Sequence, residues 1–275
     1  MFLTMLKSVI AIRSKYYVSV LLQRLKIARV SQITPALAEV AGHGNTTDYS
    51  AFRADFYRYK AGKNIKNDSL VREVDRLLPG TARIVSHPLW LLLSARGAGE
   101  LELIEYAQRL DPNLNQYLLK CIESTRAIVF RSLSKSHGCF KAGSKFLRTI
   151  DRRGLDDLAA LLIGIKSHEL RCEYCVSWPL RELVMRFFIE ISLMPEFNGV
   201  VEDLYKETHG VLAEFSYGGK YDGEICLAFA QQLARQELGH MLDIIKNVSS
   251  GRASHGGKYS EILQCDRAVD CASGD

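Results

Sequence analysis

The chain lacks the long apolar runs that a membrane protein needs. Its most hydrophobic end, residues 1–22, is interrupted by Lys7, Arg13 and Lys15, so no span approaches the roughly 20 apolar residues that cross a bilayer. A secretory signal would place cations before the apolar run and a cleavage site of small residues after it, and neither is seen. We therefore expect a cytoplasmic protein without membrane contact.

Cysteines are not arranged as the disulfide framework of a small secreted protein. Seven of the 275 residues are cysteine, an odd number scattered from Cys121 to Cys271. Reduced thiols, several of them buried as small hydrophobic residues, are the expected state. A chain of this length can instead bury a substantial apolar core, as one large domain or two ordinary ones.

One cysteine pair has the spacing of a metal or redox site. Cys172 and Cys175 are separated by two residues, and thiolates at this spacing can share a zinc ion that Cys265 and Cys271 would complete. The surrounding pattern is helical and lacks the flanking glycine usual for zinc. The sequence therefore predicts no metal, with Cys172 and Cys175 as the candidates if one binds.

Motifs of common enzyme classes are missing as well. The chain contains no GxSxG, HExxH or GxxxxGK[ST] sequence. Asp156-Asp157 and Glu202-Asp203 are adjacent carboxylates, which point about 100° apart on a helix and do not share a site. We expect no cofactor and lean against an enzyme, with an active site assembled from distant residues as the alternative.

Positive charge is present but unevenly distributed. The net charge is +7 over residues 1–80, −1 over 81–119, +7 over 120–153 and −8 over 154–275. A basic N-terminal half joined to an acidic C-terminal half is typical of a chain in which one part faces a polyanion. Solvation alone can produce the same asymmetry.

Hydrophobic periodicity is overwhelmingly helical, which predicts an all-α fold. Apolar residues recur at helical spacing along 18–28, 70–78, 114–129, 183–191, 201–212 and 224–247. The segment "LDDLAALLIGI" at 155–165 is apolar enough for a central helix. Alternation of the strand type is scarce, and "ARIVS" at 82–86 is the best candidate for a strand.

Local signals predict several element ends. Asp68 or Ser69 is expected to cap the helix that ends at Pro79-Gly80. Asp111-Pro112 should open a helix reaching Val129, and Trp178-Pro179 should open another that Pro195 ends. His87, before Pro88, is read as a helix cap, with a titrating switch as the alternative.

The N-terminal region resembles a helix-turn-helix domain of the Cro/repressor type. Residues 28–42, with Ser31, Gln32, Leu37 and Ala38, are similar to the second helix of that family. Residues 56–63 are similar to the end of its recognition helix, where an aromatic residue and a cation precede a glycine, here Gly62. The resemblance covers about residues 16–80, with 16–30 as the first helix.

This resemblance implies contact with duplex DNA. A recognition helix lies in the major groove, where cations meet phosphates or guanine edges. The implied DNA-binding residues are Arg53, Tyr57, Arg58, Lys60, Lys63 and Lys66. A helical core with a solvated basic face is the competing interpretation.

A second basic block spans residues 131–153, where cations alternate with Phe140 and Phe146. It is a candidate for secondary phosphate contacts, or an exposed connection between helices. The residues that would make these contacts are Lys135, Lys141, Lys145 and Arg148.

These observations predict a basic helix-turn-helix-like module over 1–95, a helical domain over 96–250 and a flexible polar tail over 251–275. The expected function is DNA binding by a transcriptional regulator. A homodimer, or a protein partner for the acidic half, is a further expectation. The alternatives are a helical interaction or effector protein of a mobile-element or defence system, and an enzyme with an unrecognised site.

Overall fold

The computed structural model describes residues 6–42, 47–95, 97–122, 124–131, 154–171 and 174–213. All of them belong to one compact unit, which runs from Met1 to Gly223. They are mainly helical, which confirms the predicted all-α class, with one small two-stranded sheet. Within these ranges no helix has the length and apolarity to cross a membrane.

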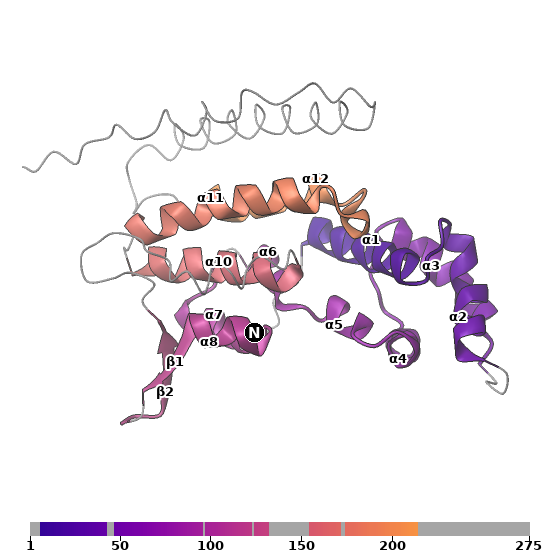
Figure 1. The fold of residues 1–275 in the computed structure, drawn as a ribbon, viewed down its shortest axis with the longest axis horizontal. Helices are drawn as coiled ribbons and strands as arrows, with labels where there is room; N and C mark the ends of the chain where they lie inside the picture. The colour runs from indigo at the N-terminus through magenta and orange to yellow at the C-terminus, as the bar shows by residue number, and fades with distance from the viewer. Residues whose placement is uncertain are drawn as a thin grey trace, which may run out of the picture. The chain divides into compact units, whose positions relative to one another are not determined.

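The N-terminal helices pack around one shared core (Figure 1). Tyr17 and Leu21 of the first helix, Ile33 of the second, Phe56 of the third and Leu70 of the fourth all contribute buried side chains. The elements are α1 (Lys7–Arg24), a 3-10 turn η1 (Val30–Gln32), α2 (Ile33–Ala41), η2 (Tyr49–Phe52), α3 (Arg53–Lys60), α4 (Asp68–Leu77) and α5 (Thr81–Val85).

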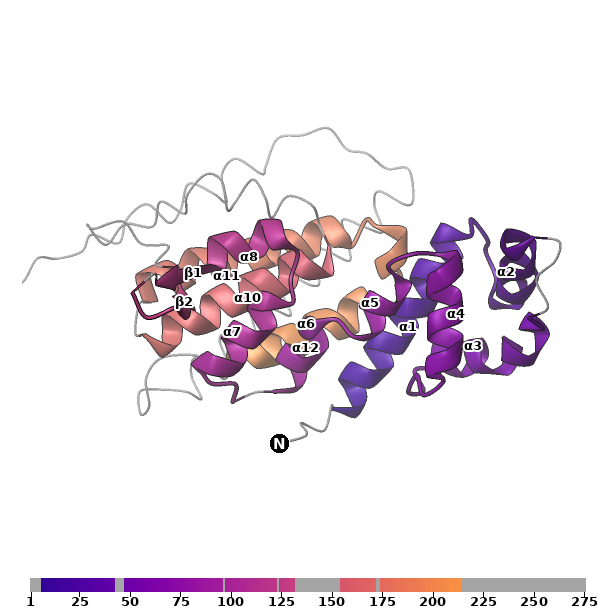
Figure 2. The same ribbon diagram turned by 90° about the horizontal axis from the view of Figure 1, so that it is seen from below.

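The later helices pack around α10, and Figure 2 shows α7 and α8 alongside it. Nearly every residue of α10 is buried, which confirms the predicted central helix at 155–165. The elements are α6 (Pro88–Ser94), α7 (Glu100–Gln108), α8 (Pro112–Leu118), β1 (Leu119–Ile122), β2 (Ala127–Phe130), α10 (Leu155–Leu170), α11 (Tyr174–Ile191), η4 (Pro195–Phe197) and α12 (Val201–Ala213).

Helix α1 contributes to both groups of helices. One side supplies Tyr17 and Leu21 to the N-terminal core. Another side packs on η4, where the Tyr16 and Phe197 ring centroids lie 4.8 Å apart. Lys15 also forms a 3.1 Å ion pair with Asp203 of α12. The first helix of the chain is therefore tied to its last described one.

Helix α1 starts and ends earlier than the predicted range 16–30. Its C-terminus closes with the N–H of Ile27 donating to the carbonyl of Leu22, and Lys26 takes a left-handed conformation with φ of 54°. Glycine usually occupies that position, so a lysine there left no sequence signal for the end. The predicted second helix, 28–42, is the short turn η1 followed by α2.

The strand predicted at 82–86 is wrong, because residues 82–85 lie in helix α5 and Ser86 caps its C-terminus. Gly80, with φ of 89°, precedes the helix, and the Asp75 carboxylate of α4 accepts a 2.8 Å hydrogen bond from the N–H of Ala82. That bond satisfies a free N–H group of the first turn. A short apolar run does not distinguish a strand from a buried helix. Here the Asp75 carboxylate of the neighbouring helix α4 stabilises the helical state by capping its first turn.

The helix predicted from Asp111-Pro112 to Val129 is half right. Asp111 caps α8 by accepting from the N–H of Asn113 at 2.8 Å, with Pro112 at the first helical position. The helix ends at Leu118, however, and an antiparallel hairpin follows in which Leu119 pairs with Phe130. Arg126, with φ of 53°, permits the turn of that hairpin, although an arginine does not signal one.

Two further element starts differ from the prediction. Asn67 rather than Asp68 or Ser69 caps α4, because its carboxamide oxygen accepts from the N–H of Leu70 at 3.1 Å. Helix α11 begins at Tyr174, so Pro179 lies inside it rather than at its start. Pro179 removes one backbone hydrogen bond within α11, and the extensive packing of α11 on α10 compensates for it.

Candidate nucleic-acid interface

Helix α3 forms because one side of it completes the N-terminal core. Phe56 and Tyr59 are 0% and 1% exposed, and their rings meet edge to face with centroids 6.4 Å apart. Tyr59 also meets the ring of Tyr17 on α1 at 6.5 Å. Asp55 in the first turn is favourable to the helix dipole. The buried side fixes the helix, and its opposite side remains in contact with solvent.

The C-terminus of α3 is closed by a glycine, as the sequence predicted. The N–H of Gly62 donates to the carbonyl of Tyr59 at 2.9 Å, and the N–H of Lys63 donates to that of Arg58 at 2.9 Å. This pair of bonds is a Schellman motif with Gly62 at φ of 79°. A β-carbon on Gly62 would lie 2.9 Å from Cβ of Ala11, so α1 also approaches the backbone here too closely for a side chain.

The loop after α3 is held at several points. Arg13 of α1 donates to the Asn64 side chain at 2.6 Å, and Ile65 is buried in the core. Asn67 donates to the Asp55 carboxylate at 3.1 Å while it caps α4. The loop is therefore a continuation of the α3 surface, with its backbone tied to both flanking helices.

All six predicted DNA-binding residues are exposed on α3 or on this loop. Arg53, Tyr57 and Lys60 are spaced i, i+4 and i+7, so they share one side of the helix. Tyr57 is 47% exposed, and the Arg58 side chain is 60% exposed. The loop carries the last two of the set, which are Lys63 and Lys66.

Little negative charge opposes these cations. Arg58 forms a 3.4 Å ion pair with Asp55, which is itself largely buried. Among the residues that the structure describes, the other four cations of the set form no ion pair; they are Arg53, Lys60, Lys63 and Lys66. The face formed by α3 and the 61–67 loop is therefore basic and largely unneutralised.

Helix α2 precedes this face in the order that the resemblance implies. Ile33 and Leu37 are buried, while Pro35 lies in the first turn, where the missing N–H costs nothing. Gly42, with φ of 77°, follows the last residue of α2. The connection to α3 runs through residues 42–52 and includes η2, whose cap is Asp48.

Several predicted site residues lie outside the described part of the chain. Lys135, Lys141, Lys145 and Arg148 of the second basic block are among them, as is Cys172. Cys175 lies in α11, but its side chain is not described. Within the described residues, no group of three or more histidine, cysteine, aspartate or glutamate side chains is arranged to hold a metal ion.

His87 caps helix α6, which confirms the structural interpretation of this residue. Its Nδ1 accepts from the N–H of Leu89 at 3.1 Å, so the proton of the neutral ring lies on Nε2, 3.2 Å from the Asp156 carboxylate. Burial lowers the pKa of His87, more than the hydrogen bond to Asp156 raises it. The ring is therefore neutral at pH 7.

Asp156 collects several partners that the sequence did not associate with it. It accepts from Arg83 at 2.9 Å and from the backbone N–H of Asp111 at 3.2 Å, in addition to His87. Burial raises the pKa of this carboxyl, but the hydrogen bond from His87 and the attraction of Arg83 outweigh it and lower the pKa overall. Asp156 therefore joins α5 and α6 to the start of α10.

Comparison with known proteins adds no relative of this chain. No protein-family model, curated protein or solved structure matches it.

Proposed function

We propose that this protein binds duplex DNA through α3 and the 61–67 loop, as a regulator that occupies an operator-like site. The observation that carries the proposal is the exposed basic face of α3, opposite a side that is fully buried. A helix in a major groove needs a rigid support and an outward face of cations and polar groups. Phe56 and Tyr59 supply the support in this chain.

Small residues on the outer face support close approach to DNA. Ala54 and Ala61 are both exposed, so the helix surface is narrow at these two positions, beside the longer side chains of Arg53, Tyr57 and Arg58. Arg53 and Arg58 can each reach a guanine edge or a phosphate. Lys63 and Lys66, on the anchored loop, are placed to contact the phosphate backbone beside the groove.

A salt titration on the full-length chain tests the proposal. We expect binding to mixed-sequence duplex DNA that weakens steeply with salt, and weaker binding by the double variant Arg53→Ala with Arg58→Ala. Each lost phosphate contact should reduce the slope of log K against log salt by about 0.9. Alanine at these exposed helical positions should change the free energy of unfolding by less than about 0.5 kcal/mol.

A matched variant controls for net charge. Lys120→Ala with Arg126→Asn removes two exposed cations from the β1–β2 hairpin, and asparagine tolerates the positive φ of position 126. This control should bind DNA as the wild type does. Equal binding by the α3 variant would contradict the residue assignment. A wild-type chain that binds no duplex at low salt would exclude DNA binding and favour a protein-interaction role.

A further inference from the structure

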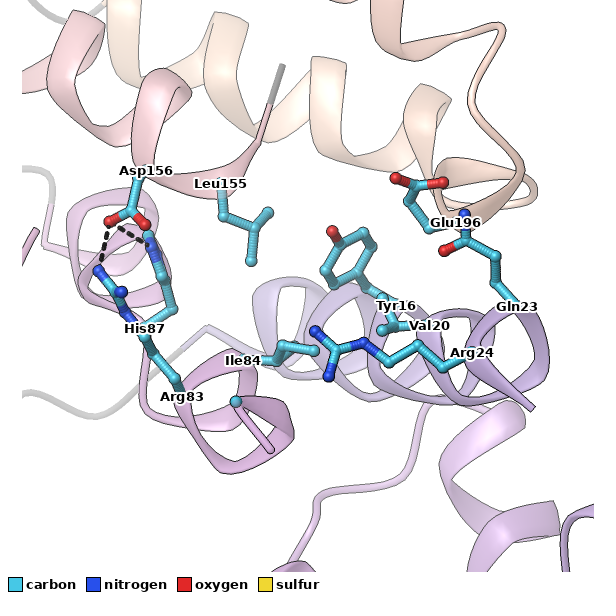
Figure 3. A pocket seen from close by; sticks show the side chains of 11 residues that line it. Tyr16, Val20, Gln23, Arg24, Arg83, Ile84, His87, Leu155, Asp156 and Glu196 are labelled. Carbon is cyan, nitrogen blue, oxygen red and sulfur yellow. Dashed lines mark hydrogen bonds and ion pairs between the residues drawn. The ribbon is translucent and has the colours of Figure 1, made fainter. Parts of the chain in front are cut away.

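A pocket of about 230 Å³ lies away from the α3 face (Figure 3). Its lining comes from α1, α5, the cap residue of α6, the start of α10 and η4, all within the same compact unit. Val20, Ile84 and Leu155 give it an apolar wall. Tyr16, Arg24 and Glu196 contribute polar groups from residues up to 180 positions apart in the chain.

Tyr16 presents a hydroxyl that no described residue uses. The residue is 7% exposed, and its ring packs on Phe197 at 4.8 Å and near Trp90 at 6.3 Å. Within the described residues its hydroxyl makes no hydrogen bond, although it lines the pocket. Burial and the nearby charge of Glu196 raise the pKa of Tyr16, so the hydroxyl keeps its proton and remains a donor.

Glu196 presents a second unused polar group. Its Oε2 atom is buried and has no hydrogen-bond partner in the part of the chain that the structure describes. Leaving a buried carboxylate oxygen unpaired is unfavourable unless something else supplies the missing partner. The Tyr16 and Glu196 residues line the same pocket, so a molecule bound there would contact both side chains.

The charges of the lining restrict what that molecule can be. Arg83 is paired with Asp156 at 2.9 Å, and His87 is neutral. Arg24 and Glu196 remain as one cation and one anion without an ion-pair partner among the described residues. A net negative ligand would meet the Glu196 carboxylate, and a net positive one would meet Arg24. The lining therefore favours a ligand with both charges.

Arg24 is oriented for such a ligand. It donates from Nη1 to the carbonyl of Pro79 at 2.7 Å, which positions the guanidinium and leaves its other N–H groups without a bond inside the described residues. Figure 3 shows the side chain running along the pocket toward Ile84. A guanidinium held in this way offers donors to a carboxylate.

We infer that the pocket binds a small zwitterion, an α-amino acid with an apolar side chain. Glu196 accepts from its ammonium group, Arg24 and the Tyr16 hydroxyl donate to its carboxylate, and Val20, Ile84 and Leu155 contact its side chain. The volume suits a ligand smaller than the drug-sized molecules that fill pockets of about 300 Å³ or more. This inference is independent of DNA binding.

Calorimetric titration of the full-length chain with each common L-amino acid tests the inference. We expect at least one with an apolar side chain, such as L-leucine, to bind at millimolar concentration or below. Its amide, which lacks the carboxylate, and its N-acetyl derivative, which lacks the ammonium group, should each bind at least about tenfold more weakly. No binding by any amino acid, equal binding of the derivatives, or binding of inorganic phosphate or putrescine instead would overturn it.

Two variants distinguish ligand contact from a structural role. Tyr16→Phe removes a hydroxyl that has no partner among the described residues, so the melting temperature of the free protein should not fall, while the affinity should drop about tenfold. Glu196→Gln should weaken binding by a similar factor, and Glu105→Gln, an exposed carboxylate on α7, should not. Wild-type affinity in either pocket variant, or a Tyr16→Phe variant that is destabilised and binds normally, contradicts the assignment.

Discussion

Gly62 shows how one residue couples the proposed DNA face to the core. It combines a φ of 79° with a close approach to Ala11 of α1, where an added β-carbon would be only 2.9 Å from Cβ. Gly80 also has positive φ, at 89°, but a β-carbon there would meet nothing nearer than an Arg24 nitrogen at 3.9 Å. Substitution of Gly80 would therefore cause backbone strain alone, whereas substitution of Gly62 would cause both backbone strain and steric overlap.

We expect Gly62→Ala to destabilise the protein more than Gly80→Ala does. Both variants pay about 1–2 kcal/mol for a left-handed conformation, and only Gly62→Ala adds about 1–3 kcal/mol of overpacking against α1. Urea unfolding of the two variants and the wild type measures the difference. Equal losses would show that α1 does not approach this backbone closely.

At the scale of elements, side chains from neighbouring segments decide where the helices begin. Asn67 caps α4 through Leu70 and also donates to Asp55 of α3, so one carboxamide joins two helices. Asp75 of α4 does the same for the start of α5. Sequence patterns predicted that helices exist at 18–28, 70–78 and 155–165, but they selected the wrong cap for α4 and the wrong class for α5.

Replacing Asn67 tests this assignment of the cap. Asn67→Ala should reduce the free energy of unfolding by about 1–2 kcal/mol, because the N–H of Leu70 loses its acceptor. Asp68→Ala, which removes only a favourable charge near the helix dipole, should cost no more than about 1 kcal/mol. Thermal or urea unfolding gives both values. A larger loss for Asp68→Ala would restore Asp68 as the cap.

An Asn67→Ser variant separates the two bonds of this side chain. Serine keeps a capping oxygen but lacks the Nδ2 group that donates to Asp55, so the stability of this variant should lie between those of the wild type and the alanine variant. If Asn67→Ser were as unstable as Asn67→Ala, the bond to Asp55 rather than the cap would account for the loss.

At the scale of the whole molecule, the Asp156 carboxylate forms hydrogen bonds with residues 83, 87 and 111, which are distant from it in the sequence. His87 must stay neutral to do its part, because Nδ1 accepts the N–H of Leu89. Burial lowers its pKa, so the folded protein binds this proton less readily than the unfolded chain does. Stability is therefore linked to pH through His87.

The sign of this linkage can be measured. The stability that neutral His87 contributes to the folded state is fully present above the unfolded pKa of about 6.5. It is lost as the pH falls through the lowered pKa of the folded state, at up to about 1.4 kcal/mol for each pH unit. We expect His87→Asn, which keeps a capping oxygen but does not titrate, to lose less stability than the wild type between pH 7.5 and 5 (about the range in which a histidine titrates). Denaturant unfolding across this range provides the test.

The other titrating groups do not obscure that comparison. Asp156 has a lowered pKa, so its own contribution persists above its unfolded pKa of about 3.9 and is lost only at lower pH. The remaining histidines are the same in both proteins. Identical pH profiles for the wild type and His87→Asn would show that the His87 ring does not control stability.

The sequence by itself determined the helical class, the buried helix α10 and the outward position of the α3 cations. Each depends on a signal within one segment: a 3.6-residue period for the helical class and the α3 cations, and an almost continuous apolar run for α10. The glycine that closes α3, Gly62, could also be predicted from the sequence. Its signal, an aromatic residue and a cation followed by glycine, lies within a few residues of the chain.

Only the tertiary structure decided the contacts between distant segments. The approach of Ala11 to Gly62, the meeting of His87 with Asp156 and the pocket that unites Tyr16 with Glu196 all depend on how helices pack. No local period encodes such pairings, because they follow from the shape and burial of whole faces rather than from neighbours along the chain.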